Sequence, residues 1–268
     1  MKIDQQTLKQ LEELIRHAAK EELLPRFQKI EREFKDDGSI VTEADHAMQA
    51  RIITELEKLW PVIPLLGEEM TPAEQQALID ENTDGLWILD PLDGTSNFSS
   101  GIPCFSVSLA LLVDHQIQFG LIYDPNHDEC FSAIAAEGAW LNGEKLAQTP
   151  TSLPLSKCIA QLDFKRLPKK MAAEIASNPP YTSQRSFGSG ALDWCWVAAG
   201  RVHIYLHGQQ KLWDYSAGQL ILREAGGHCC SLDSDTVFRG KMEPRSVIAA
   251  LDTQHYDEWK TYVLGLAE

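Results

Sequence analysis

The sequence predicts a mixed α+β or α/β fold of layered helices and sheets in two subdomains, residues 1–147 and 148–268. Three observations predict it. Amphipathic helical segments open the chain, short strand-like apolar runs follow from residue 62, and helix-like and strand-like segments alternate after residue 157. Helices, then strands, then alternation are typical of layered α and β elements, and a chain of 268 residues is long enough for about two domains.

Two helices are expected before residue 60. The first 24 residues carry apolar side chains at three- and four-residue spacings, with Pro25 as a stop, at Leu8, Leu11, Leu14, Ile15, Ala18 and Leu23. A second helix should run from about Thr42 to Leu59 and end before Pro61, and Asp37-Gly38 before it is typical of a turn.

Short apolar runs rich in β-branched and aromatic residues predict five strands in the first half, at 62–67, 86–90, 105–113, 116–124 and 129–135. Two prolines and several Ser and Thr residues at 147–157 mark the expected domain boundary. Beyond it, we expect strands at 158–164, 202–206 and 246–251, and helices at 191–200, 214–225 and the end of the chain.

Composition excludes several classes of protein. Hydrophobic residues make up 44% and charged residues 24%, which is ordinary for a globular protein. The net charge of −15 disfavours a nucleic-acid partner and requires local cations for any anionic ligand. The absence of an 18-residue apolar run and of a signal core predicts a soluble cytoplasmic protein without a membrane partner. Six cysteines without metal-type spacing predict reduced thiols.

The segment Trp87 to Thr95, WILDPLDGT, is the most informative stretch. An apolar strand ends at Asp90, and Pro91 lacks the N–H that a central ladder needs, so we expect the chain to turn there. Asp90 and Asp93 would then leave one strand end together, as hard oxygen ligands suited to Mg²⁺. If a helix starts after Gly94, the N–H groups of Gly94 and Thr95 would face an anion. The alternative is an Asp-rich surface turn.

Three further acidic segments each have an ordinary structural explanation. Glu68 and Glu69 follow a strand-like run and fit an exit loop. Asp214 lies where a helix should begin and fits an N-cap, and Thr42 with Asp45 fits a capping box. Spacing alone does not show that these acids meet in space.

Four segments occur in the order and spacing of the inositol monophosphatase family: 37–45 (DGSIVTEAD), 67–69 (GEE), 90–95 (DPLDGT) and 213–218 (WDYSAG). The sequence resembles this family, part of the lithium-sensitive, metal-dependent sugar-phosphatase superfamily, from about residue 35 to 230. The resemblance implies a layered αβαβα sugar-phosphatase fold with the metal site between the two halves, and a homodimer.

The resemblance also implies two or three Mg²⁺ ions per active site, with ligands at Glu68, Asp90, Asp93, Asp214 and the carbonyl of Leu92. Paired metals suit the hydrolysis of a phosphate monoester, because they polarise the phosphoryl group, generate hydroxide and stabilise the leaving alkoxide. Thr95 and Asp45 resemble the pair that orients the attacking water, and Glu69 resembles an outer acid of the same cluster. The N–H groups of Gly94 and Thr95 would bind phosphate oxygens.

The substrate end departs from the family pattern. A Glu that contacts inositol hydroxyls in relatives corresponds to His207, which can still bond a hydroxyl or can be a surface residue. Ser189 and Gly190 resemble a family segment beside the substrate, and Gly190 in place of the usual Ala is expected to widen that spot. Lys35 corresponds loosely to a mobile-loop lysine, and Ser39 stands where some relatives carry an Asp for a third metal.

We therefore expect a Mg²⁺-dependent phosphomonoesterase acting on a small phosphorylated substrate, by default myo-inositol monophosphate. Relatives that hydrolyse 3′(2′),5′-bisphosphate nucleotides, fructose 1,6-bisphosphate or histidinol phosphate are the alternatives within this chemistry. A nucleotidase would need a stacking slot, which Trp194, Trp196 and Tyr205 could form if they are not core residues. A regulatory binding protein that keeps the fold is the alternative of a different class, since some bacterial relatives bind transcription machinery. A two-metal nuclease fits the negative charge poorly.

Overall fold

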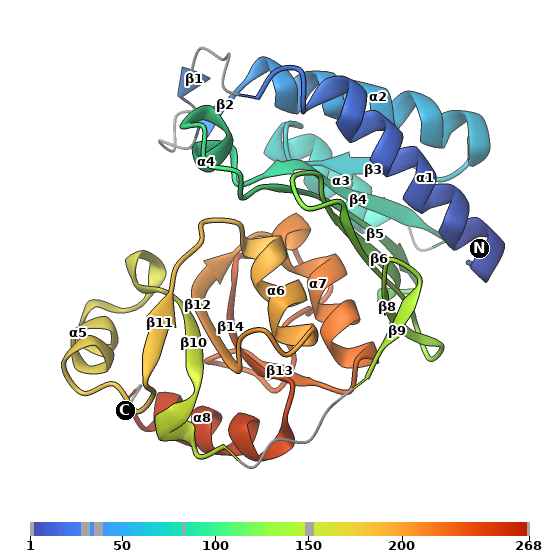
Figure 1. Ribbon diagram of the computed structural model, residues 1–268. Helices are drawn as coiled ribbons and strands as arrows, with labels where there is room; N and C mark the ends of the chain where they lie inside the picture. The colour runs from blue at the N-terminus through green and yellow to red at the C-terminus, as the bar shows by residue number, and fades with distance from the viewer. Residues whose placement is uncertain (1–2, 28–32, 35–39, 82–83, 148–152, 267–268) are drawn as a thin grey trace.

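Helices and sheets alternate in five layers in the computed structural model (Figure 1). The structure describes residues 3–27, 33–34, 40–81, 84–147 and 153–266. The layers are a helix pair, a seven-stranded sheet, a second helix pair, a five-stranded sheet and a third helix pair. This is the predicted αβαβα architecture.

The first layer holds the two predicted N-terminal helices, α1 (Gln5–Glu22) and α2 (Glu43–Leu59). Asp4 caps α1, since its carboxylate accepts a hydrogen bond from the Thr7 N–H at 2.8 Å. The Thr42 N–H donates to Asp45 Oδ2 at 2.8 Å, which is half of the expected capping box of α2. The Asp37-Gly38 turn lies outside the described residues.

The seven-stranded sheet has the order β3-β4-β5-β6-β7-β8-β9. Its strands are β3 (Leu65–Gly67), β4 (Leu86–Asp93), β5 (Ser106–Val113), β6 (Gln116–Asp124), β7 (Glu129–Ile134), β8 (Gly138–Leu141) and β9 (Glu144–Leu146). Only the β3–β4 pair of this sheet is parallel. Leu109 and Leu111 pack towards α1 and α2, whereas Ala110 and Leu112 face the second helix pair. The five strands predicted in this half are confirmed.

The five-stranded sheet has the order β11-β10-β12-β14-β13. Its strands are β10 (Ile159–Asp163), β11 (Ser183–Arg185), β12 (Ile204–Gln210), β13 (His228–Cys230) and β14 (Arg245–Ala250). The helices α6 (Gly190–Ala198) and α7 (Leu212–Glu224) lie between the two sheets (Figure 1). The outer layer is formed by α5 (Lys169–Ser177) and α8 (Thr253–Gly265), whose Met171 and Trp259 belong to one buried cluster with Ile248 of β14.

The shorter elements are β1 (Glu33–Phe34), β2 (Ile40–Val41), α4 (Thr95–Ser99) and the 3₁₀ turns η1 (Leu155–Lys157) and η2 (Phe164–Arg166). The sequence interpretation missed α3 (Pro72–Glu81). Its start carries a local signal, since Thr71 N donates to Glu74 Oε2 at 2.9 Å in the T-x-x-E pattern of a helix start.

The two sheets fall on either side of the expected boundary, because β9 ends at Leu146 and β10 begins at Ile159. One core nevertheless joins the halves, since Ile88 of β4, Leu220 of α7 and Val247 of β14 belong to a single buried cluster. The division at residue 147 stays a prediction. Within the described residues, no helix combines the length and the apolar character needed to cross a membrane.

Candidate active site

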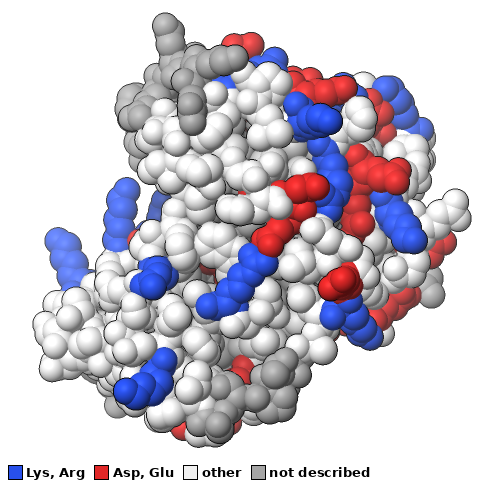
Figure 2. All heavy atoms as spheres, in the orientation of Figure 1, with Lys and Arg blue, Asp and Glu red and all other residues white. Residues whose placement is uncertain are grey.

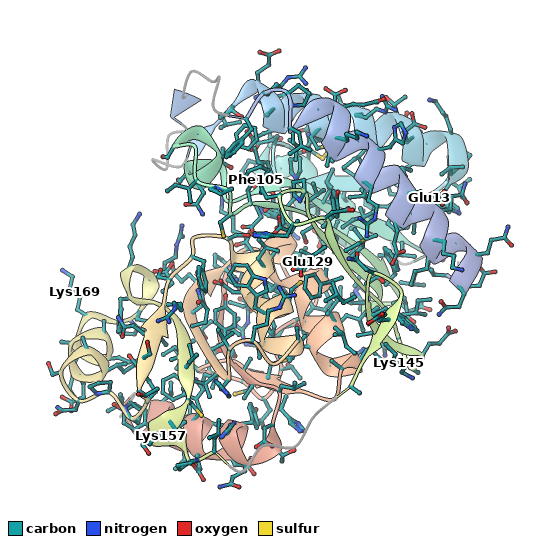
Figure 3. All side chains as sticks on the ribbon, viewed as in Figure 1. Glu13, Phe105, Glu129, Lys145, Lys157 and Lys169 are labelled. Atoms are coloured by element: carbon teal, nitrogen blue, oxygen red, sulfur yellow. The ribbon has the colours of Figure 1, made fainter. Side chains whose placement is uncertain are left out.

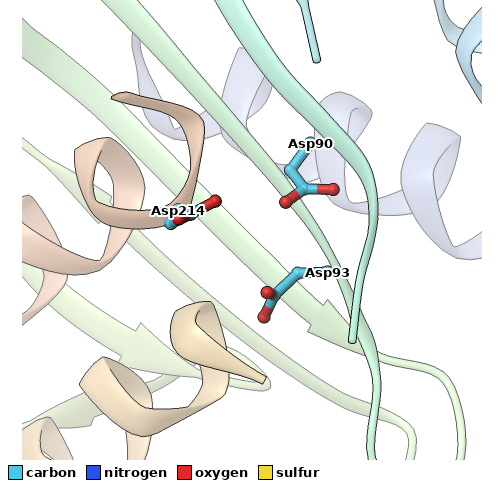
Figure 4. Close-up of side chains that lie close together, drawn as sticks. All are labelled: Asp90, Asp93 and Asp214. Carbon is cyan, nitrogen blue, oxygen red and sulfur yellow. The ribbon is translucent and has the colours of Figure 1, made fainter. Parts of the chain in front are cut away.

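The sequence predicts that the strand ends at Asp90 and that the chain turns at Pro91, but β4 continues to Asp93. Asp90 lies opposite Ser108 of β5 and Asp93 lies opposite Ser106, so β4 holds one residue more than β5 between these pairs. Pro91 lies in this irregular stretch, where the missing N–H disturbs no regular ladder. In a regular strand, side chains three residues apart point to opposite faces, and the extra residue brings both aspartates to one side. Figure 4 shows their carboxyl groups turned towards a common space.

Asp214 approaches the same space from the first turn of α7 (Figure 4). The N-cap interpretation of Asp214 is wrong, because Lys211 is the N-cap of α7 and Asp214 lies inside the first turn. Its Oδ2 accepts a hydrogen bond from the Lys211 N–H at 2.8 Å, so Asp214 still caps the helix start as the third residue of a capping box. Carboxylate oxygens of Asp90, Asp93 and Asp214 all lie within 4.8 Å of one another. The sequence signals therefore meet at one point between the sheet and the central helices.

Glu68 joins this cluster from the end of β3, which runs parallel to β4. Its N–H donates to the Leu89 carbonyl at 3.1 Å, which holds the residue beside Asp90. The negative charge of Glu68 contributes to raising the pKa values of Asp90 and Asp214. We call Glu68, Asp90, Asp93 and Asp214 the acidic cluster.

Burial and mutual repulsion disfavour the charged forms in the acidic cluster. Burial raises the pKa of Asp90 well above its usual range, and the charges of Glu68 and Asp93 add to this rise. Burial, with the charges of Asp93 and Glu68, raises the pKa of Asp214 to about 8. Oxygen ligands packed together against their own repulsion suit a divalent cation, whose charge would offset theirs. The residues present fit Mg²⁺.

A second group of residues lies where the resemblance expects the water-orienting pair. Thr95 Oγ1 lies 3.1 Å from Asp45 Oδ1 and 2.9 Å from the Leu92 carbonyl oxygen. Asp45 is buried, which raises its pKa to about 6 although bonds from Thr42 oppose the rise. The nearby charge of Glu69 adds to it. Thr95, Asp45, Leu92 and Glu69 thus lie around one end of β4.

Gly94 connects β4 to α4, which begins at Thr95 as expected. Its φ of 92° lies in the left-handed region that favours glycine. A Cβ at this position would lie 2.9 Å from the Cys104 carbonyl oxygen, so the backbone at Gly94 passes too close to Cys104 for a larger residue. The start of α4 is therefore held directly beside Asp93.

The predicted substrate residues Ser189 and Gly190 contact Asp93. The Gly190 and Ala191 N–H groups donate to Asp93 at 3.2 Å and 2.8 Å, and the Ser189 hydroxyl donates to Asp93 Oδ2 as well. The space beside Gly190 is not open, contrary to expectation. A Cβ there would lie 2.7 Å from Gln210 Nε2, because the buried Gln210 amide occupies that spot.

A pocket of 290 Å³ opens beside the acidic cluster. His207 lines it and is only 8% exposed, so it is not a surface residue. Its Nε2 lies 3.1 Å from Asp163 Oδ2, and its Nδ1 accepts the Gln209 N–H at 3.2 Å. These two contacts place the proton on Nε2 and engage both ring nitrogens within the protein.

Several pocket residues were missed from the sequence: Asp163, Lys165, Arg166, Gln209 and Gln210. They come from η2 and from the ends of β10 and β12, and no local pattern marks them. Lys35 and Ser39 lie outside the described residues.

The three aromatic residues considered for a base-stacking slot do not line this pocket. Trp194 and Tyr205 are fully buried in the core, with ring centroids 5.6 Å apart. Trp196 packs on Phe187 along a different groove. The core interpretation of Trp194 and Tyr205 is therefore correct.

The fold and the acidic cluster are those of a sugar-phosphatase-type protein, and comparison with known families agrees. The inositol monophosphatase family profile matches residues 2–264. The chain belongs to the inositol monophosphatase family.

Three relatives illustrate the range of similar proteins. Nus factor SuhB of Haemophilus influenzae is 37% identical over 82% of this chain and 81% of the relative. Inositol monophosphatase 1 of Solanum lycopersicum is 36% identical over 72% of each chain. An IMPase/NADP phosphatase solved with Mg²⁺ and phosphate superposes with a TM-score of 0.81 at 26% identity, covering 97% of this chain and 95% of that one.

Proposed function

We propose that this protein is a Mg²⁺-dependent phosphomonoesterase that hydrolyses a small polyol or sugar phosphate. The observation that carries the proposal is the convergence of Asp90, Asp93 and Asp214, with ligand atoms within 4.8 Å of one another, beside the Asp45–Thr95 pair. Family membership and a similar structure solved with Mg²⁺ and phosphate support the same chemistry.

Glu68, Asp90, Asp93, Asp214 and the Leu92 carbonyl are the groups that would hold two or three Mg²⁺ ions. When bound, such ions polarise a phosphoryl oxygen and lower the pKa of a water molecule. Asp93 is already oriented for this role by α6, because the Gly190 and Ala191 N–H groups bond its carboxylate. Because the carboxylate is already held in position, it would need little reorganisation when a metal binds.

Thr95 and Asp45 would position the attacking water. The Thr95 hydroxyl bonds either Asp45 Oδ1 or the Leu92 carbonyl, which leaves an oxygen lone pair to accept a hydrogen bond from water. Asp45 is itself held by Thr42, whose N–H and hydroxyl bond Oδ2 at 2.8 Å and 2.6 Å. Glu69 would act as an outer acid of the same cluster, next to Asp45. The N–H groups of Gly94 and Thr95 would bind phosphate oxygens.

Myo-inositol monophosphate remains the default substrate, and the name of the tomato relative supports it. Ser189 and Gly190 are the proposed substrate contacts beside Asp93. His207 is proposed to line the substrate pocket with its ring, since both of its ring nitrogens are bonded within the protein. Bisphosphate nucleotides, fructose 1,6-bisphosphate and histidinol phosphate are the alternatives. From the resemblance we also propose lithium sensitivity, a homodimer and a cytoplasmic location.

The test is release of inorganic phosphate from this panel of substrates, with and without Mg²⁺ and Li⁺. We expect Mg²⁺-dependent release at least 100-fold above that of an Asp93→Asn variant prepared identically, because phosphoryl transfer depends on the charge-stabilising ligands. Equal release by both proteins would reveal a contaminant. No Mg²⁺-dependent release from any substrate would refute the proposal.

A regulatory role is a second candidate, favoured by the 37% identical relative named Nus factor SuhB. A binding protein has no need for the charge of Asp93. If Asp93→Asn abolishes hydrolysis but still complements a deletion strain, the cellular role is that of a binding protein; if both are lost, the enzyme activity accounts for the role.

A further inference from the structure

The cationic side of the substrate pocket lies on the 3₁₀ turn η2, which carries Lys165 and Arg166. Both residues line the same pocket as Asp93 and Asp214. This pocket therefore joins the acidic cluster to two basic residues that the phosphate-ester chemistry itself does not use.

The turn is held firmly against the sheet. The Lys165 N–H donates to Asp163 Oδ1 at 2.9 Å, which closes η2 at its start. A Cβ on Gly208 would lie 1.7 Å from the Arg166 carbonyl oxygen, so the turn packs on bare backbone of β12 beside His207. The place of Lys165 and Arg166 along the pocket is thus set by backbone contacts.

The acidic residues of the pocket do not neutralise both of its basic side chains. Arg166 Nε lies 3.9 Å from Asp163 Oδ2, and Asp163 also bonds His207. No ion pair to the Lys165 ammonium occurs among the described residues. Asp193 also lines the pocket, and burial raises its pKa well above the usual range, which favours its neutral form. In a chain of net charge −15, two basic residues at the pocket form a local site for an anion.

We propose that Lys165 and Arg166 bind a second phosphate group of the substrate, so that the preferred substrate is a sugar or polyol bisphosphate. This inference rests on the proposed phosphomonoesterase function and narrows its substrate class. His207 engages both ring nitrogens within the protein, so recognition at this end passes to the cations of η2. A guanidinium and an ammonium are the side chains that bind phosphate best.

The pocket favours a sugar over a nucleoside. Its volume of 290 Å³ is at the small end of ligand sites, which span roughly 300–1,000 Å³. His207 is the only ring system among its lining residues that the structure describes, and its edges are already bonded. A nucleoside would lack the stacking surface that bases prefer.

The experiment compares matched substrates that differ by one phosphate, using the full chain with Mg²⁺. The pairs are fructose 1,6-bisphosphate with fructose 1-phosphate, and 3′-phosphoadenosine 5′-phosphate with 3′-AMP. The variants are Lys165→Met, Arg166→Met, the double variant and Arg166→Lys. Lys169→Met is the charge-matched control, because Lys169 projects outward from α5 (Figure 3) and does not line the pocket.

We expect the wild type to favour fructose 1,6-bisphosphate over fructose 1-phosphate by about 30-fold in kcat/KM, since a charge-assisted hydrogen bond contributes roughly one order of magnitude or more. The double variant should lose this preference through a higher KM, with fructose 1-phosphate hydrolysis unchanged within about twofold. Arg166→Lys should keep part of the preference, and Lys169→Met all of it.

Three results would overturn the inference: no preference in the wild type, a preference that survives in the double variant, or a preference confined to the nucleotide pair. In each of them, Mg²⁺-dependent hydrolysis of the monophosphates would leave the proposed function intact. Loss of all Mg²⁺-dependent hydrolysis would refute the proposed function instead, so the two failures are distinguishable.

Discussion

Two clusters of charged side chains in this protein differ in how their charge is balanced. In the acidic cluster, Asp90 is buried with Asp93, Asp214 and Glu68 around it, and burial and repulsion raise its pKa. In the second cluster, the buried Arg245 bonds Asp233 at 2.8 Å and 3.1 Å, and the pKa of Asp233 is lowered by the Ser231 hydroxyl and by Arg245. We call this second group the Arg245 cluster.

The comparison separates a structural charge from a functional one. Arg245 satisfies the Val237 carbonyl and the Ser231 hydroxyl, at 2.9 Å and 2.7 Å, besides its acids. Such an arrangement is complete in itself and stabilises the fold. In the acidic cluster the carboxylates repel one another, and the bound cation proposed above would offset their charges. The surface shows a related contrast, with acidic and basic side chains interspersed over α1 and mostly basic ones beside α5 and β11 (Figure 2).

The largest expected effect comes from Asp90→Asn. Removing one carboxylate charge should lower kcat/KM by at least about 1,000-fold, because transition-state charge stabilisation is the main contribution in phosphoryl transfer. Without Mg²⁺, the melting temperature should not fall, since burial and repulsion already disfavour the charged form of Asp90, and the asparagine oxygen still accepts the Leu92 N–H. Kinetics and thermal melts in EDTA measure both. A strongly destabilised variant would show that the cluster is structural.

Arg245→Met should lower the stability of the fold rather than the activity. It removes a buried cation and its bonds, so we expect a loss of about 2–3 kcal/mol in the free energy of unfolding. Arg239→Met is the matched control, because Arg239 faces the same Asp233 and Glu243 at 3.7 Å and 3.9 Å but is largely exposed, and it should cost less than about 0.5 kcal/mol. Urea unfolding measures the difference. Comparable losses in the two variants would contradict the contrast.

Thr95→Val tests whether the Thr95 hydroxyl, beside the acidic cluster, positions the attacking water. Losing the hydroxyl that bonds Asp45 should lower kcat by about 100-fold, in the range of general acid–base contributions, with little change in stability. Thr95→Ser keeps the hydroxyl and should stay within about tenfold of the wild type. Equal kcat values for the valine and serine variants would rule out a role for the hydroxyl.

The smallest effect is stabilisation by Mg²⁺ itself. At tenfold its Kd, Mg²⁺ should stabilise the wild type by about 1.4 kcal/mol, because it binds the folded state preferentially. Asp90→Asn should show little of this gain, whereas Arg239→Met should show all of it. Thermal melts with MgCl₂ against NaCl of equal ionic strength measure the gain. A gain of the same size in Asp90→Asn would place the metal elsewhere.

Much of the fold was predictable because its signals are local. The helix α1 and the strand β5 follow directly from apolar periodicity, and α2 begins at its expected cap, Thr42. The motif acids were predictable as a set only through their order along the chain. The helix α3 was missed although Thr71 and Glu74 mark its start.

Two other predictions failed because they depend on contacts between elements that are distant in the sequence. The passage of β4 through Pro91 required the register with β5, where one extra residue realigns Asp93. The filling of the space beside Gly190 by Gln210 likewise follows from how β12 packs on α6.

The sequence by itself determined the residue types of the site and the apolar periodicity of its helices and strands, because both depend on a few neighbouring positions. Tertiary structure alone decided that Asp214 meets β4, that His207 is bonded to Asp163, and that Lys165 lies along the pocket. These juxtapositions arise from sheet order and layer packing, which join residues far apart in the chain. No local pattern carries that information.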